Sequence, residues 1–344
     1  MNKFMGFVRR ERIYLFLLIF ILTLNLAVAL AGGEKWKAKE KPGYSAEELF
    51  IREAEMGKLL ASNRPLAFVL SLSSLLVFAV ILLGMLIDAT LVSFKLAKRK
   101  FDIVTLKPES VRWNLIDVGR MAILFLFFGY MLVIIESLLI GELPILKNDN
   151  FRMMLNSSIL DTLAVVFIIY FTVGQYKEKL VALGISLKNF FKNVFYGIIG
   201  YIAAVPVLVA ALFIVVALIN LTKYVPEKQA VVELFMKEDN APFLIYTGIF
   251  AAFAGPIVEE LFFRGFMYGA FKKSIGIFWA AILTSTLFAA LHTHIVGFLP
   301  ILILGMLLAY LYEKTGTLVS SITVHTIHNL SMVFFVFLLK QIKA

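Results

Sequence analysis

Residues 194–220 are VFYGIIGYIAAVPVLVAALFIVVALIN, an apolar stretch without a single charged side chain. A stretch of this length crosses the hydrocarbon core of a bilayer as one helix. Similar stretches recur along the chain, which is 61% hydrophobic and has a mean hydropathy of +0.90. Ten-residue segments of alternating polarity, typical of membrane β-barrels, are absent from the sequence. The sequence therefore predicts an all-α, polytopic transmembrane helical bundle.

The apolar stretches predict eight or nine transmembrane helices. The segments at 277–293 and 297–313 are short, so one of them is expected to be tilted or re-entrant. The longest polar connection, 32–65, is expected to contain an exposed or interfacial helix at 46–60. The predicted spans are 14–31, 67–91, 118–140, 159–175, 194–220, 242–271, 277–293, 297–313 and 318–339.

The chain carries 33 basic and 23 acidic residues, and its net charge is therefore +10. Basic residues gather in the segments 1–12 and 95–112, which predicts that both segments and the N-terminus are cytoplasmic. In a prokaryote the membrane concerned is the cell membrane. The run 14–30 is expected to remain as a first span, because it is longer than a usual signal-peptide core.

Composition also excludes several classes of function. No basic face interleaved with aromatic residues is present, so the expected partner of the basic segments is the lipid bilayer and not a nucleic acid. The chain has no cysteine, which excludes disulfides, thiol nucleophiles and thiolate metal sites. No internal repeat favours an inverted-repeat transporter.

Polar residues appear within apolar sequence in the last quarter of the chain, in EELFFR (259–264), FAALH (288–292) and HTIHN (325–329). All four histidines of the chain fall between 292 and 328. Polar groups inside hydrocarbon are costly and usually functional. This clustering predicts a reaction centre within the membrane.

The first of these segments places two acidic side chains on different faces of one helix. Glu260 and Arg264 are four residues apart, so they share a face and are expected to form an ion pair that supports packing. Glu259 is rotated by about 100° from Glu260. An unpaired carboxylate in hydrocarbon would be protonated, so Glu259 needs a different partner.

His292 is the expected partner of Glu259. A turn is predicted at 272–276, and Glu259 and His292 each lie about sixteen residues from its centre. In an antiparallel helical hairpin both residues would lie about 25 Å from the turn, at the same depth. Phe288, one helical turn before His292, is expected to form a wall of the site.

His325 and Asn329 are four residues apart on the last predicted helix, which is expected to begin after Gly316. A glutamate beside an imidazole can take a proton from water. An imidazole N–H and a carboxamide NH₂ can stabilise a developing oxyanion. Together with Glu259 and His292, these residues suit hydrolysis of a peptide bond by water.

A metal site is the alternative chemistry, because two histidines and a glutamate form a common zinc set. Zinc or another divalent metal would then be held by Glu259, His292 and His325. The chain has no His-Glu-x-x-His segment, so we expect no metal or other cofactor. His294 and His328 are expected to be ordinary polar residues near the site.

The three segments, Glu259-Glu260-x-x-x-Arg264, Phe288-x-x-x-His292 and His325-x-x-x-Asn329, resemble the motifs of the CPBP family, the CAAX prenyl protease and Abi proteins. The resemblance implies an intramembrane endopeptidase of the CAAX-processing type. It implies that Glu259 and His292 activate water, that His325 and Asn329 stabilise the oxyanion, and that Glu260 and Arg264 give structural support.

The resemblance covers about residues 190–340, so residues 191–344 are expected to be the catalytic core and residues 1–190 an accessory transmembrane region. It implies a prenylated or membrane-embedded peptide or protein as substrate. Two other functions stay open. One is a non-catalytic scaffold, regulator or bacteriocin-immunity protein on the same fold, and the other is a transporter that uses Glu259 and His292 as a proton relay.

Overall fold

The computed structural model describes residues 2–31, 62–99, 106–224, 229–292 and 295–343, and the regular structure in these residues is all helical. The predicted all-α class is confirmed. The helix expected at 46–60 and His294 lie outside the described residues. The α-helices are α1 (Asn2–Ala31), α3 (Arg64–Leu96), α4 (Leu115–Leu139), α5 (Asp149–Ile169), α6 (Phe190–Thr222), α7 (Ala230–Lys237), α8 (Ala241–Ile249), α9 (Gly255–Glu260), α10 (Gly269–Leu291), α11 (Ile295–Thr315) and α12 (Leu318–Lys343).

Short 3₁₀ and π segments join several of these helices. Three are π-helices, which form hydrogen bonds five residues back instead of four. The 3₁₀ segments are η1 (Pro144–Lys147) and η3 (Leu180–Leu183), and the π segments are η2 (Tyr170–Gln175), η4 (Phe250–Ala254) and η5 (Leu261–Tyr268).

Seven helical runs among the described residues are long and apolar enough to cross a membrane. The chain is therefore a multi-pass helical membrane protein, as predicted. The predicted spans 242–271 and 277–293 both fall in one of these runs, Ala241–Leu291, and the predicted span 14–31 lies in α1, which is not one of the seven. The other six runs are Arg64–Leu96, Leu115–Leu139, Asp149–Gln175, Phe190–Thr222, Ile295–Thr315 and Leu318–Gln341.

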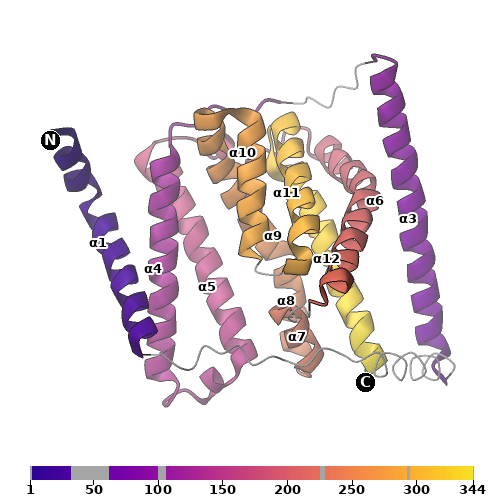
Figure 1. Cartoon of the computed structure of the whole chain (residues 1–344), viewed down its shortest axis with the longest axis horizontal. Helices are drawn as coiled ribbons and strands as arrows, with labels where there is room; N and C mark the ends of the chain where they lie inside the picture. Colours follow the sequence, from indigo (N-terminus) through magenta and orange to yellow (C-terminus); the bar gives the residue numbers. More distant parts are fainter. Residues whose placement is uncertain (1, 32–61, 100–105, 225–228, 293–294, 344) are drawn as a thin grey trace. The chain divides into compact units, whose positions relative to one another are not determined.

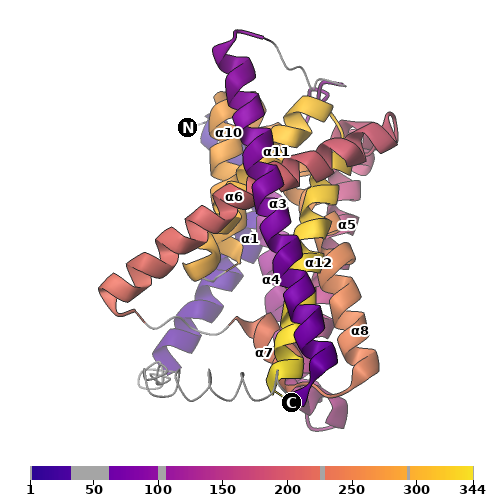
Figure 2. The same cartoon turned by 90° about the vertical axis from the view of Figure 1, so that its right-hand side faces the viewer.

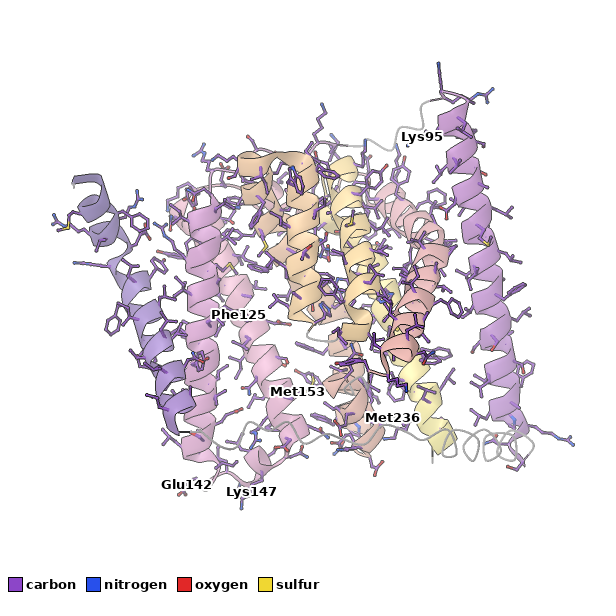
Figure 3. The ribbon with its side chains drawn as sticks, viewed as in Figure 1. Lys95, Phe125, Glu142, Lys147, Met153 and Met236 are labelled. Atoms are coloured by element: carbon purple, nitrogen blue, oxygen red, sulfur yellow. The ribbon has the colours of Figure 1, made fainter. Side chains whose placement is uncertain are left out.

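Apolar and charged side chains occupy different positions along α3 and α4. Phe125 lies part-way along α4, whereas Glu142 and Lys147 lie in the connection between α4 and α5 (Figure 3). Lys95 lies at the end of α3. These three charged residues thus lie at or beyond the ends of the spans.

The chain forms two compact units, and α1, α4 and α5 belong to the first. In this unit α1 packs against α4 and α4 packs against α5. Aromatic side chains fill both contacts. The rings of Phe20 and Phe127 have centroids 5.8 Å apart, and those of Phe128 and Phe167 are 5.5 Å apart.

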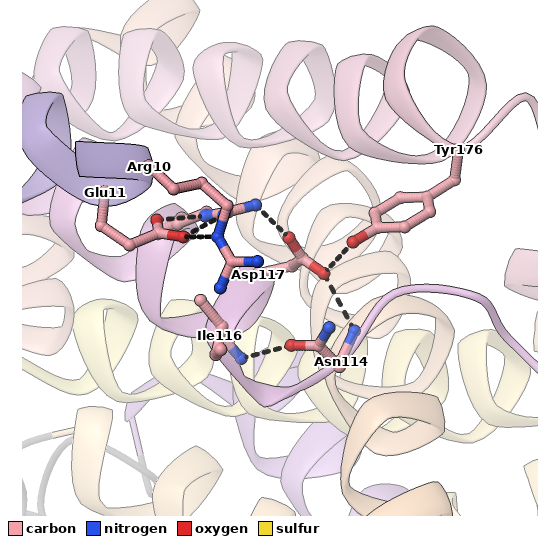
Figure 4. A network of polar contacts seen from close by, with 7 residues as sticks. Arg10, Glu11, Asn114, Ile116, Asp117 and Tyr176 are labelled. Atoms are coloured by element: carbon pink, nitrogen blue, oxygen red, sulfur yellow. Dashed lines mark hydrogen bonds and ion pairs between the residues drawn. The ribbon is translucent and has the colours of Figure 1, made fainter. Parts of the chain in front are cut away.

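A buried polar network ties α1 to α4 near their charged ends (Figure 4). Arg120 donates hydrogen bonds to Glu11 at 2.8 and 2.5 Å and to Asp117 at 2.7 Å. The second Asp117 oxygen accepts from the Tyr176 hydroxyl at 2.5 Å and from the Asn114 backbone at 3.0 Å. Each carboxylate in the network is thus fully occupied by donors, which compensates for its burial.

The second unit contains α3 and the helices from α6 to α12. Its core lies where α6, α11 and α12 meet, and α11 also packs along α10 (Figure 1). Leu208, Leu304, Leu308 and Val324 are buried together there. This arrangement places α9, α10 and α12 around the predicted site.

Glycine allows close helix contacts in the second unit. α3 crosses α6 (Figure 2), and a Cβ atom at Gly84 would lie 2.3 Å from the carbonyl oxygen of Ile202. A Cβ atom at Gly197 on α6 would lie 2.8 Å from the carbonyl oxygen of Ser320 on α12. Small residues at such positions let backbones approach within a membrane.

The two units do not coincide with the regions expected from the sequence. The boundary expected near residue 190 falls inside the second unit, and α3 groups with the C-terminal helices although it precedes that boundary. The assignment of an accessory role to residues 1–190 and a catalytic role to residues 191–344 concerns function, and it stays a prediction.

Candidate active site

The site is built on a helical hairpin that reverses at Gly276. This residue has φ 79° and ψ 171°, a conformation that only glycine adopts without strain. The turn predicted at 272–276 is thus confirmed, and Figure 1 shows the reversal at one end of α10. Phe263 and Phe288 face each other across the hairpin, with ring centroids 5.1 Å apart.

Glu259 and His292 lie one helical turn beyond this aromatic pair, on opposite legs of the hairpin. The structure brings them together, with Glu259 Oε2 and His292 Nε2 4.0 Å apart. The equal spacing of the two residues from the turn therefore predicted their depth correctly. Both side chains are partly exposed, at 35% for Glu259 and 30% for His292.

Glu260 and Arg264 form the predicted ion pair, and both are buried. Arg264 Nη1 donates to Glu260 Oε1 at 2.7 Å. Arg264 Nη2 donates to the backbone carbonyl of Gly305 on α11 at 3.1 Å. The guanidinium therefore links the first motif to a neighbouring helix as well as to its own.

His325 lies between the two adjacent glutamates. Its Nδ1 atom is 3.0 Å from Glu260 Oε1, and its Nε2 atom is 3.7 Å from Glu259 Oε2. A carboxylate paired with arginine can only accept, so Nδ1 carries the proton and donates it to Glu260. The sequence did not predict this contact, because it depends on the rotation of α12 about its own axis.

The tautomer of His292 follows from a similar contact. Its Nδ1 atom lies 2.7 Å from the carbonyl oxygen of Phe288, one turn earlier on α10. A carbonyl can only accept, so Nδ1 donates and, in the neutral ring, Nε2 is left with a lone pair. Both imidazoles therefore direct Nε2 toward the carboxylate of Glu259.

Phe288 is buried and packs against both histidines and Arg264. The sequence predicted that this side chain would form a wall of the site. Its ring centroid is 4.7 Å from that of His292 and 5.5 Å from that of His325. The guanidinium carbon of Arg264 lies 4.5 Å from the same ring, in cation–π geometry. One aromatic side chain thus fixes the lateral positions of two imidazoles and a guanidinium.

Asn329 follows His325 by one turn of α12, and it is held by the opposite leg of the site. Its Nδ2 atom donates to the carbonyl oxygen of Ala251 in η4 at 2.9 Å. The amide NH₂ is therefore oriented by the helix that also carries Glu259. No sequence motif marks Ala251, since a backbone carbonyl has the same chemistry at every residue.

His328 faces a different neighbour. Its Nδ1 atom lies 3.4 Å from the Tyr201 hydroxyl on α6, and the two rings meet edge-to-face with centroids 6.0 Å apart. This contact agrees with the expectation that His328 is an ordinary polar residue beside the site. The sequence did not predict the contact with Tyr201, because Tyr201 is a single aromatic residue in an apolar helix.

Within the described part of the chain, no group of three or more acidic or imidazole side chains is arranged to hold a metal ion. The residues that the sequence predicted as alternative metal ligands are Glu259, His292 and His325. Each of its imidazoles already uses Nδ1 in a hydrogen bond, and each retains Nε2 toward Glu259. Cleavage in the presence of a chelator therefore distinguishes metal-free hydrolysis from the metal-dependent alternative.

Residues 241–331 match the family model described as Type II CAAX prenyl endopeptidase Rce1-like. The matched segment begins with α8 and ends within α12, and it contains every site residue predicted from the sequence. The match and the site geometry therefore concern the same part of the molecule.

The chain spans about a third of the length of one curated relative that it matches and about two fifths of the length of another. The chain is 30% identical over 81 residues to "Putative membrane peptidase YdiL" of Bacillus subtilis (strain 168), which covers 24% of this chain and 33% of that protein. It is 34% identical over 76 residues to "UPF0177 protein YxdF" of Lactococcus lactis subsp. lactis (strain IL1403), which covers 22% of this chain and 41% of that protein. No solved structure matches the chain significantly.

Proposed function

We propose that this protein is an intramembrane endopeptidase that hydrolyses a peptide bond with water activated by Glu259 and His292. One observation carries the proposal: Glu259 Oε2 faces Nε2 of both His292 and His325, at 4.0 and 3.7 Å. These separations exceed direct hydrogen bonds and suit a water molecule between the three groups. Glu259 Oε2 is buried and has no hydrogen-bond partner among the described residues, so it has the unused acceptor capacity that a bound water would fill.

The proposed reaction begins with proton transfer from water to Glu259, while the oxygen attacks the carbonyl carbon of the scissile bond. His292 Nε2 has the free lone pair needed to accept a hydrogen bond from the same water, or to receive the proton afterwards. The proton then moves to the amide nitrogen, the C–N bond breaks, and the amine leaves while the other fragment becomes a carboxylic acid. The sequence of steps uses one water molecule for each bond cleaved.

Negative charge develops on the carbonyl oxygen of the substrate, and His325 and Asn329 are the proposed donors to it. As a donor to the oxyanion His325 would use Nε2–H, because Nδ1–H binds Glu260. Glu260 and Arg264 thus act by holding His325, and no metal or other cofactor takes part in this proposal.

The proposed substrate is a prenylated or membrane-embedded peptide or protein. A site carried by helices that cross the bilayer is reached by substrates that diffuse laterally in it. The description of the matched family, a CAAX prenyl endopeptidase, and the name of the Bacillus subtilis relative support this class. Equal cleavage of a soluble peptide without a lipid would contradict it.

The test is to incubate the purified protein with a farnesylated CAAX peptide, with and without a chelator, beside Glu259→Gln. Glu136→Gln is the matched control, because Glu136 is a carboxylate on α4 that accepts a hydrogen bond from Asn156 at 3.1 Å and lies in the other unit. Chelator-resistant cleavage that only Glu259→Gln abolishes supports the proposal. Chelator-sensitive cleavage restores the metal alternative, and absence of any cleavage favours a non-catalytic role.

A further inference from the structure

The helix that carries Glu259 contains a proline, Pro256, three residues earlier. Proline lacks a backbone N–H, and its ring collides with the carbonyl four residues before it in an α-helix. Here the helix avoids the collision through the π segment η4, immediately before α9. The N–H of Gly255 accordingly donates to the carbonyl of Phe250, five residues back.

The change of register leaves one carbonyl without a backbone donor. In an α-helix the carbonyl of Ala251 would accept from Gly255, and in a π-helix it would accept from residue 256. Gly255 donates to Phe250 instead, and Pro256 has no N–H to donate. A partly buried carbonyl without a donor is costly inside a membrane helix, so the Ala251 oxygen needs a partner from elsewhere.

Asn329 supplies this partner through Nδ2, 2.9 Å from the Ala251 oxygen. Because a carbonyl only accepts, the contact fixes which end of the amide faces η4. One N–H of the NH₂ group is held there and the second stays available. The proline therefore determines both the position and the orientation of the Asn329 side chain.

We propose that Pro256 is a positioning residue for Asn329, which it holds through the carbonyl that it leaves without a backbone donor. The catalytic consequence rests on the function proposed above, in which Asn329 donates to the oxyanion. The effect on stability does not rest on that function, because it concerns only which group donates a hydrogen bond to the Ala251 carbonyl. Two measurements therefore test the two parts separately.

The first measurement is a double-mutant cycle on the thermal unfolding midpoint of the full chain in detergent. Asn329→Ala should lower the midpoint by about 3 °C or more, because it removes the side-chain donor to the Ala251 carbonyl. In a Pro256→Ala background the backbone supplies that donor in either register, so Asn329→Ala should cost less than half as much. Equal losses in both backgrounds would overturn the proposal.

The second measurement is the kinetics of peptide cleavage. Pro256→Ala should reduce kcat by about tenfold to a hundredfold with KM unchanged, because the amide donor is displaced after its anchor is satisfied. Its unfolding midpoint should stay equal or rise, which separates positioning from simple loss of fold. Pro300→Ala, which removes a proline inside α11, is the control and should retain kcat.

A wild-type kcat in Pro256→Ala, with Glu259→Gln inactive, would reject the positioning role and leave the proposed function in place. If the wild-type protein itself cleaves no peptide, the proposed function fails, and the stability cycle alone decides the link between Pro256 and Asn329. Pro256→Ser also restores an N–H and replaces Pro256→Ala in both measurements if the alanine variant does not fold.

Discussion

Glu260 Oε1 accepts a hydrogen bond from His325 Nδ1 at 3.0 Å, although 65 residues separate the two along the chain. The same oxygen accepts from Arg264 at 2.7 Å. Glu260 therefore orients the histidine that faces Glu259, as a buried carboxylate orients the histidine of a catalytic triad. Its role extends beyond the packing contact that its spacing from Arg264 predicts.

The first prediction concerns Glu259→Gln, which should abolish hydrolysis and leave the unfolding midpoint close to that of the wild type. The amide cannot take a proton from water, and the side chain is 35% exposed, so its replacement leaves no buried charge unpaired. A drop in kcat of about a thousandfold or more is expected. Substantial residual turnover would remove Glu259 as the base.

Glu260→Gln should lower stability as well as activity, unlike Glu259→Gln. Arg264 would remain buried with a neutral partner, and His325 would lose the carboxylate that accepts its Nδ1 hydrogen bond. The measurements are the unfolding midpoint and kcat of the variant. Wild-type values of both would show that the Glu260 carboxylate is dispensable.

Arg264→Ala should destabilise the second unit by about 3–5 kcal/mol, because it leaves Glu260 buried without its guanidinium. Arg264→Lys should rescue only part of this loss, since an ammonium cannot reach Glu260 and the Gly305 carbonyl in the same planar geometry. Chemical denaturation in detergent measures the effect, and Arg10→Ala, at an exposed arginine of the other unit, is the control. A fully active and stable Arg264→Ala protein would show that the pair is dispensable.

Phe288→Ala should destabilise the protein by about 3–5 kcal/mol and also lower kcat. The substitution removes the ring that packs on His292, His325 and Arg264 at once. Phe288→Leu keeps most of the volume without the cation–π contact, so it should recover stability more fully than activity. Equal recovery of both would mean that Phe288 only fills space.

The polar network of the first unit predicts how stability depends on pH at both extremes. The hydrogen bonds from Arg120 lower the pKa of Glu11 below 4.5, so stability is full above that pH and falls as pH decreases through the lowered value. Burial, together with the hydrogen bond that it donates to Asp117, raises the pKa of Tyr176 from 10 to about 12. Stability from Tyr176 is therefore full below pH 10 and is lost between pH 10 and 12.

Unfolding midpoints recorded across both pH ranges check this prediction. Tyr176→Phe should remove the alkaline loss that belongs to this side chain while leaving the acidic limb intact. Glu11→Gln should do the reverse. If neither variant changes its own limb, groups outside this network control the pH dependence.

Much of the site was predictable because helical geometry fixes distances along a helix and across a hairpin. The Glu260–Arg264 pair follows from spacing alone, and the depth of Glu259 and His292 follows from their equal distance to Gly276. The resemblance to CPBP motifs pointed to the same segment that the Rce1-like family model matches.

The features that sequence reasoning missed share a physical cause. The Glu260–His325 bond depends on how α12 is rotated, which spacing between motifs does not determine. The carbonyls of Ala251 and Gly305 accept hydrogen bonds from Asn329 and Arg264, and no side-chain pattern predicts a contact made by the backbone. The grouping of α3 with the second unit reflects its packing along α6, including the close approach at Gly84, which no pattern within α3 specifies.

The π segment η4 also limits how the length of this stretch can vary. A π-helix holds one more residue than an α-helix over the same hydrogen-bonded turn. A regular α-helix through the same residues would therefore rotate Glu259 by about 100° about the helix axis relative to α8, away from His292. Removing one residue from η4 would cancel that rotation, so the direction of Glu259 should tolerate the loss of one residue here better than the gain of one.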